Sequence, residues 1–209
     1  MELQKRECGI KVSLEPSGCQ FLHVSFDFGG ERLEFLPSSV MSGQFADLIR
    51  ALYSLYPERY SGQSSLDDDW RKRKYLSDEK HVIHGTAVTV DWDNEGEELT
   101  LELTREINGS VIGIRATMDG EETVGEYTVD DRDFCYAVTK AYTEVLKKFG
   151  FFGYVYSTEG DTVMLHQFLF LKAYALGNME ARELTEAEDG SERRRTNFEK
   201  ELELLLFDM

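Results

Sequence analysis

The stretch VTVDWDNEGEELTLELTRE, residues 88–106, decides the fold, because its apolar residues recur at every second position on either side of a turn. Successive side chains of a strand point to opposite faces, so this period of two predicts an antiparallel hairpin. One face of the hairpin is apolar: Val88, Val90, Trp92, Leu99, Leu101 and Leu103. The other face is acidic or hydroxylated: Asp91, Asp93, Thr100, Glu102 and Thr104.

Turn signals extend this hairpin into a meander. Asn-Gly and Asp-Gly suit tight hairpin turns because both central residues tolerate positive φ. Together with the turn NEGE, Asn108-Gly109 and Asp119-Gly120 predict four consecutive antiparallel strands: 84–93, 98–106, 110–118 and 122–130. The last two strands keep the alternation, with Arg115, Thr117, Glu126 and Thr128 on the polar side. An antiparallel sheet can leave one face in water, so we expect an open polar face.

Helices are predicted mainly in the second half of the chain. Residues 132–149 carry an apolar stripe at helical spacing, with aspartates at the start and Gly150 just beyond the end, and this helix is expected to cover the apolar face of the meander. Further helices are expected at 45–56, 162–176 and 197–207, the last one opened by a capping box of Thr196 and Glu199.

The remaining segments complete the expected architecture. Strands are predicted at 9–15, 20–28 and 31–36, a long polar connection at 57–80 and an aromatic connector at 150–157. We therefore predict a single α+β domain over 1–209: an antiparallel meander sheet with one face covered by helices and one face open, plus C-terminal helices. Residues 179–209 are expected to form a charged connector and an appended C-terminal helix.

The overall charge limits the classes of partner. The chain has 40 acidic and 23 basic residues and a net charge of -17, which disfavours binding to nucleic acid or to an anionic membrane. The N-terminus shows no apolar signal-peptide core, and the apolar run 163–176 is too short and interrupted to span a bilayer. Three cysteines without metal-site spacing fit reduced thiols. These observations predict a cytoplasmic protein.

The negative charge is concentrated on the meander. Residues 91–133 contain 14 acidic and 3 basic side chains, a net charge of -11 in about a fifth of the chain. This concentration fits either a solvated face that keeps the sheet soluble or a docking surface for a basic protein. If it is a docking surface, the candidate partner-binding residues are Asp91, Asp93, Glu95, Glu97, Glu98, Glu102 and Glu126.

The sequence contains no recognisable catalytic motif, and we predict no catalytic residue, metal ligand or cofactor. His81 and His84 have the spacing of two ligands on a helix but precede a strand, and no Cys, Asp or Glu follows at a completing interval. Cys135 lies between Phe134 and Tyr136, where a buried packing cysteine is favoured over a nucleophile. Phosphate-binding glycine loops and nucleophile-elbow patterns are absent from the sequence.

Three segments together resemble a known class of proteins. DWDNEGEELTLELTRE, VIGIRATMDGEE and DFCYAVTKAYTEVLKKFGFFGY, all within residues 84–156, are similar to small acidic bacterial proteins that have a Trp-containing acidic hairpin followed by a helix with a Gly-aromatic end. Some of these are suspected immunity proteins of polymorphic or contact-dependent toxin systems. The resemblance implies a stoichiometric inhibitor of a toxin domain, and it transfers no catalytic residues.

Three hypotheses about function follow. The first is a non-catalytic immunity-type binding protein that docks a basic partner, such as a toxin domain, through the acidic sheet face. The second is a small-molecule enzyme with a dispersed active site. The third is an oligomerising structural protein, which forms a homodimer through the apolar helix near 162–176 or through the C-terminal helix.

Overall fold

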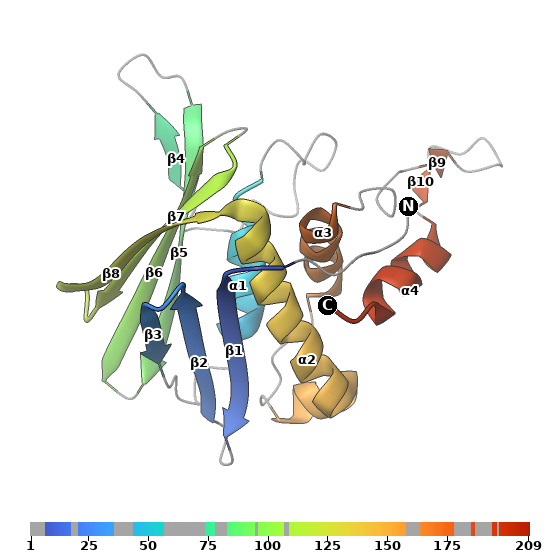
Figure 1. The fold of residues 1–209 in the computed structure, drawn as a ribbon, viewed down its shortest axis with the longest axis horizontal. Helices are drawn as coiled ribbons and strands as arrows, with labels where there is room; N and C mark the ends of the chain where they lie inside the picture. Colours follow the sequence, from blue (N-terminus) through green and yellow to red (C-terminus); the bar gives the residue numbers. More distant parts are fainter. Residues whose placement is uncertain are drawn as a thin grey trace.

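The computed structural model describes residues 7–17, 21–35, 44–56, 74–77, 83–94, 96–106, 109–157, 164–177, 185–186, 194–195 and 197–209. These residues form a five-stranded sheet, a three-stranded sheet, a two-stranded ladder and four helices (Figure 1). Every strand pair is antiparallel, which confirms the predicted α+β class with an antiparallel sheet.

The predicted meander forms most of the five-stranded sheet. Its strands follow in sequence order: β4 (Lys74–Ser77), β5 (Ile83–Asn94), β6 (Glu97–Glu106), β7 (Val111–Met118) and β8 (Glu122–Asp130). The Asp119-Gly120 turn has positive φ at both residues, 51° and 69°, and the Glu121 N–H donates to the Met118 carbonyl at 3.1 Å. This is the tight turn that the sequence predicts.

β4 departs from the prediction, because residues 74–77 were placed in the long polar connection. The strand pairs with residues 83–87 of β5, and its register shifts between Leu76 and Ser77. A four-residue edge strand is held by main-chain hydrogen bonds, so it needs no long alternating pattern that a sequence could reveal.

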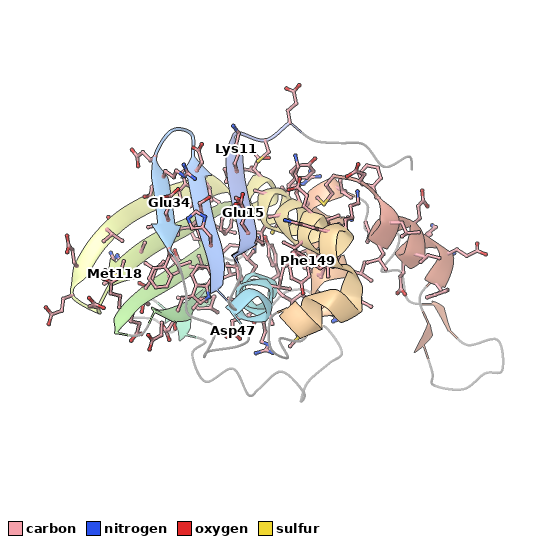
Figure 2. The ribbon with its side chains drawn as sticks, turned by 90° about the horizontal axis from the view of Figure 1, so that it is seen from below. Lys11, Glu15, Glu34, Asp47, Met118 and Phe149 are labelled. Atoms are coloured by element: carbon pink, nitrogen blue, oxygen red, sulfur yellow. The ribbon has the colours of Figure 1, made fainter. Side chains whose placement is uncertain are left out.

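The N-terminal segments form a separate three-stranded sheet of β1 (Ile10–Ser17), β2 (Phe21–Phe28) and β3 (Arg32–Phe35), with β2 in the centre. Gly29 and Gly30 have positive φ, as the predicted tight turn between β2 and β3 requires. Figure 2 shows Lys11, Glu15 and Glu34 on the outer side of this sheet, away from the core.

The apolar face of β5–β8 is covered, but not by helices alone. α1 (Gln44–Ser54) packs on β5, and α2 (Asp131–Ser157) packs on β7 and β8. In addition, the Phe26 ring of β2 stacks on Trp92 with centroids 6.1 Å apart, and Phe28 stacks on Tyr127 at 4.1 Å. The three-stranded sheet therefore covers part of the apolar face that was predicted to lie under helices alone. This packing also removes the apolar side of β2 from water.

The helices begin and end close to their predicted positions. α2 breaks at Gly150, where φ is 67° and ψ is 171°, and then continues to Ser157 through the segment predicted as an aromatic connector. α3 (Leu165–Leu176) ends at Gly177 in the left-handed conformation. α4 (Phe198–Leu206) begins after Asn197, whose side chain accepts a hydrogen bond from the Lys200 N–H.

The start of α4 corrects one prediction. The expected capping box of Thr196 and Glu199 is wrong by one residue, because Asn197 is the N-cap. Asparagine is a better N-cap than threonine, which favours Asn197 over its neighbour Thr196, a residue outside the described ranges. Upstream of α4, the charged segment predicted as a connector contains a short ladder of β9 (Thr185–Glu186) and β10 (Arg194–Arg195).

α3 lies at the centre of the helical layer and contacts α1, α2 and α4. The sequence predicts that this nearly all-apolar helix is buried or forms an interface, and within the chain six of its residues are buried: Phe168, Phe170, Leu171, Lys172, Ala173 and Ala175. Among these six buried residues, Lys172 carries the one charged side chain.

Candidate functional site

The outer face of the five-stranded sheet is the side turned away from α1, α2 and β2. We define it by the outward residues of β5–β8: Thr89, Asp91, Asp93, Glu98, Thr100, Glu102, Thr104, Arg115, Thr117, Glu126 and Thr128. On the opposite side, Leu99, Leu101 and Leu103 are at most 1% exposed. The alternation read from the sequence therefore holds along the whole hairpin.

Arg115 is the cation at the centre of this face. The strand register places it between Glu102 on β6 and Glu126 on β8. Its Nε donates to Glu126 Oε1 at 2.8 Å, and one terminal nitrogen lies 3.8 Å from Glu102 Oε2. The Arg115 side chain is 57% exposed, so solvent screens both interactions.

The remaining carboxylates are held by short-range hydrogen bonds within the hairpins. Asp91 Oδ1 accepts a bond from the Thr100 hydroxyl at 3.1 Å, and Asp93 Oδ1 accepts one from the Gly96 N–H at 3.3 Å. Asp119, in the β7–β8 turn, accepts a bond from the Glu98 N–H at 2.8 Å. These contacts orient the carboxylates of Asp91, Asp93 and Asp119 within the hairpins.

The outer face has a shallow depression of ≈ 370 Å³ beside Arg115. Its floor lies over Gly113, which pairs with Thr104 on one side and Thr128 on the other. A Cβ at Gly113 would stand 2.6 Å from Thr104 Oγ1, so the missing side chain is what opens the hollow. Glu102 and Glu126 complete its rim.

Five of the seven predicted partner-binding residues lie together on the outer face: Asp91, Asp93, Glu98, Glu102 and Glu126. Glu97 is exposed, but it alternates with Leu99 and therefore belongs to the other side of the hairpin end. Glu95 lies outside the described residues. The sequence reading did not assign Arg115 a role in the site, although the alternation already placed it on the same face.

A second polar cluster, which the sequence reading missed, is buried on the inner side. Asp131, at the start of α2, accepts hydrogen bonds from Arg105 Nε at 3.1 Å and from the Tyr174 hydroxyl at 2.7 Å. The Arg105 guanidinium lies 4.4 Å from the centroid of the Tyr56 ring, and the Tyr56 hydroxyl is 3.2 Å from Cys135 Sγ. These five residues, here called the buried cluster, join β6, α2, α3 and the residues directly after α1.

The environment of the buried cluster keeps the Cys135 thiol and the hydroxyls of Tyr56 and Tyr174 protonated. Burial raises the pKa of the Cys135 thiol to about 12, partly opposed by the hydrogen bond with Tyr56. Burial and the neighbouring Cys135 raise the pKa of Tyr56, and burial and Asp131 raise that of Tyr174. A thiol that remains protonated is a poor nucleophile, so Cys135 is a packing residue, as the sequence reading favoured.

Lys172 is the second buried cation. Its Nζ donates to the carbonyls of Phe207 at 2.8 Å and Leu205 at 3.3 Å, and to the Thr143 hydroxyl at 3.4 Å. Burial and the nearby charge of Lys147 lower the pKa of Lys172 to about 8, and Asp208 acts in the opposite direction. The ammonium thus connects α3 to the C-terminal end of α4, whose last carbonyls carry partial negative charge.

The sequence contained a signal for Arg105 but none for its partners. Arg105 continues the inward series Leu99, Leu101 and Leu103, so strict alternation places a guanidinium in the core. An inward cation requires an anion, but Asp131 also fits the N-terminal turn of a helix, where the sequence reading assigned it. Only the tertiary arrangement shows which role it has.

None of the described helices is both long and apolar enough to cross a membrane. No group of three or more His, Cys, Asp or Glu side chains within the described ranges is placed to hold a metal ion. His81 lies outside those ranges.

Comparisons with family models, with curated proteins and with solved structures find no match to this chain.

Proposed function

We propose that this protein is a non-catalytic binding protein, and that a basic protein docks on its outer face. The observation that carries this proposal is the concentration of negative charge on one sheet face that no described helix or strand covers. On it Asp91, Asp93, Glu98, Glu102 and Glu126 accompany one arginine among the described outward residues of β5–β8. The resemblance to immunity proteins suggests that the partner is a basic toxin domain and that the complex forms in the cytoplasm.

Physical chemistry favours this face for fast and oriented binding. Carboxylates on a rigid sheet lose little conformational freedom when a partner arrives, so the cost of ordering is small. A field of one sign also attracts an oppositely charged partner and raises its association rate. The depression over Gly113, rimmed by Glu102 and Glu126, gives a lysine or arginine side chain of the partner a place to enter.

The proposal can be tested by charge reversal with a matched control. The first variant combines Glu98→Lys, Glu102→Lys and Glu126→Lys on the outer face. The control combines Glu7→Lys, Glu31→Lys and Glu144→Lys, which are exposed carboxylates elsewhere on the molecule. Both variants change the net charge by the same amount, so a difference between them reports on position rather than on total charge.

The measurement has two stages. Low-salt capture from source cells, followed by mass spectrometry, identifies candidate basic partners, and the association rate of the purified pair is then measured against salt concentration. We expect the outer-face variant to lower the association rate at least tenfold and the control to change it less than twofold. If no basic protein binds, or if both variants weaken binding equally, the proposal is wrong.

The immunity role has its own readout. Expression of the identified partner alone should arrest cell growth, and co-expression of this protein should restore it. The outer-face variant should fail to restore growth while the control variant succeeds. A partner that binds but is harmless would retain the docking proposal and exclude the immunity role.

A further inference from the structure

α4 presents an unusual apolar surface at the end of the molecule opposite to the outer face (Figure 1). Phe198 is 72% exposed, Leu202 42% and Leu206 69%. Single exposed apolar residues are ordinary on protein surfaces, but these three recur at every fourth position and form one continuous stripe. We refer to these three residues as the α4 stripe.

The helix that carries this stripe is fixed to the body of the protein. Leu204, on the opposite side of α4, is buried against Ala173 of α3, and the side chain of Asn197 caps the N-terminus of α4. At the other end, Lys172 holds the carbonyls of Leu205 and Phe207, and the C-terminal Met209 is buried. The stripe is thus displayed on a preorganised helix, which lowers the entropic cost of binding.

Carboxylates line the stripe on both sides. At 100° per residue, Glu199 and Glu203 fall along one edge and Glu201 along the other, while Lys200 turns toward the body. Glu199 and Glu203 are exposed, and Glu201 and Lys200 are partly buried. The surface offered to a partner is therefore apolar in the middle and negative at its rims.

We propose that the α4 stripe docks into an apolar groove, rimmed by lysine or arginine, on a partner protein. An amphipathic helix laid into a groove is a common mode of recognition, and the acidic edges select for cationic rims. A two-fold dimer through α4 is disfavoured, because it would oppose the carboxylates of one copy to those of the other in a chain of net charge -17. This inference does not depend on the outer face being a docking surface.

A defined probe tests this chemistry before the natural partner is known. The probe is a synthetic amphipathic helical peptide of leucine and lysine, about four turns long, and the control peptide has glutamine in place of lysine. Binding is measured by fluorescence anisotropy, and amide shift changes in NMR spectra locate the site on the wild-type protein. We expect the shifts on residues 198–206 and weaker binding of the glutamine peptide.

Three variants distinguish binding to the α4 stripe from non-specific hydrophobic binding and from purely electrostatic binding. The stripe variant combines Phe198→Ser, Leu202→Ser and Leu206→Ser, and we expect it to weaken binding at least tenfold. The control combines Val111→Ser, Val124→Ser and Leu165→Ser, which are exposed apolar residues elsewhere, and should change affinity less than twofold. The rim variant, Glu199→Gln with Glu203→Gln, should weaken binding several-fold and reduce its dependence on salt.

Several outcomes would overturn the proposal. The inference fails if the stripe variant binds as tightly as wild type, or if the shift changes fall on the outer face rather than on α4. Sedimentation of the wild type and the stripe variant tests the alternative occupant. A dimer that the stripe variant abolishes would show that a second copy covers α4, against the proposal.

Discussion

Two arginines on adjacent strands of the five-stranded sheet, Arg105 of β6 and Arg115 of β7, each pair with a carboxylate, one on each face of the sheet. On the inner face, Arg105 Nε lies 3.1 Å from Asp131 Oδ2, and the two side chains are 4% and 2% exposed. On the outer face, Arg115 Nε lies 2.8 Å from Glu126 Oε1, and these side chains are 57% and 62% exposed. The shorter contact belongs to the more exposed pair.

The comparison indicates that the solvent exposure of an ion pair, rather than its N–O distance, determines how much stability is lost when one partner is removed. Water and salt screen Arg115 and Glu126, so removing either one leaves the other well solvated. Arg105 and Asp131 have lost their water, and the Tyr174 hydroxyl and the Tyr56 ring take its place. Removing either partner there would leave a charge in the core without a counter-charge.

The largest effect is expected from breaking the inner pair. Asp131→Asn keeps the shape of the side chain but leaves the Arg105 guanidinium without its counter-charge, and should lower the free energy of unfolding by about 3–5 kcal/mol. Urea denaturation followed by circular dichroism measures the change. The double variant Arg105→Met with Asp131→Asn should recover part of the loss, because no unpaired charge then remains in the buried cluster. A loss below about 1 kcal/mol for Asp131→Asn would contradict the contrast between the faces.

The next largest effect is expected from replacing one of two neighbouring residues of β6 whose side chains point to opposite faces of the sheet. Leu101 is 1% exposed on the inner face, so Leu101→Ala should lower the free energy of unfolding by about 3 kcal/mol through lost burial and the cavity left behind. Thr100 points outward, and Thr100→Ala, which removes the hydroxyl bonded to Asp91, should lower stability by no more than about 1 kcal/mol. Thermal unfolding of the two variants gives both values. Similar losses for the two would mean that the outer face is covered in solution.

The same contrast explains how much of the fold the sequence could predict. The period of two from Val88 to Leu103 determines which residues are buried, and the Asp119-Gly120 turn determines that β7 and β8 are neighbours. Both signals lie within short stretches of sequence, so they can be recognised without any knowledge of the tertiary structure. The outer face could be predicted because it is simply the other half of this alternation.

The inner polar groups and the packing of the two sheets could not be predicted in this way. Asp131, Tyr56 and Tyr174 come from separate elements, and no local pattern determines which side chains meet around Arg105. The stacking of Phe26 on Trp92 likewise joins two sheets that only the tertiary fold brings together. β4 escaped prediction because an edge strand held by its backbone has little sequence signature.

Lys172 extends the comparison to a buried cation whose hydrogen-bond acceptors are two carbonyls and a hydroxyl. The predicted effect is the change of its stability contribution with pH. Its folded pKa of about 8 lies below the ordinary value of 10.5, so between these values the unfolded chain binds more protons and stability rises with pH. Other groups titrate in the same range, and a Lys172→Met variant therefore serves as the reference. Relative to that variant, the wild type should be about 1 kcal/mol more stable at pH 9 than at pH 7. Urea denaturation at the two pH values measures this difference. A constant difference would show that the pKa of Lys172 is not shifted by folding, and an opposite difference that its acceptors stabilise the ammonium more than burial destabilises it.

The smallest effect is expected from breaking the outer pair. Glu126→Gln removes one charge from a pair that is more than half exposed, and should change the free energy of unfolding by less than about 1 kcal/mol. The sign can be either one, because the lost attraction to Arg115 is offset by less repulsion from Glu102, which lies near the same guanidinium. The decisive measurement is urea denaturation in low salt and in about 1 M salt, where the Debye length falls to about 3 Å and the effect should vanish.

A loss that persists in high salt would mean that Glu126 acts through a hydrogen bond that salt does not screen, and the two arginine pairs would then differ less than their exposures suggest. If the loss does vanish, the carboxylates of the outer face contribute little to folding, and they can be exchanged in binding experiments without disturbing the sheet that presents them.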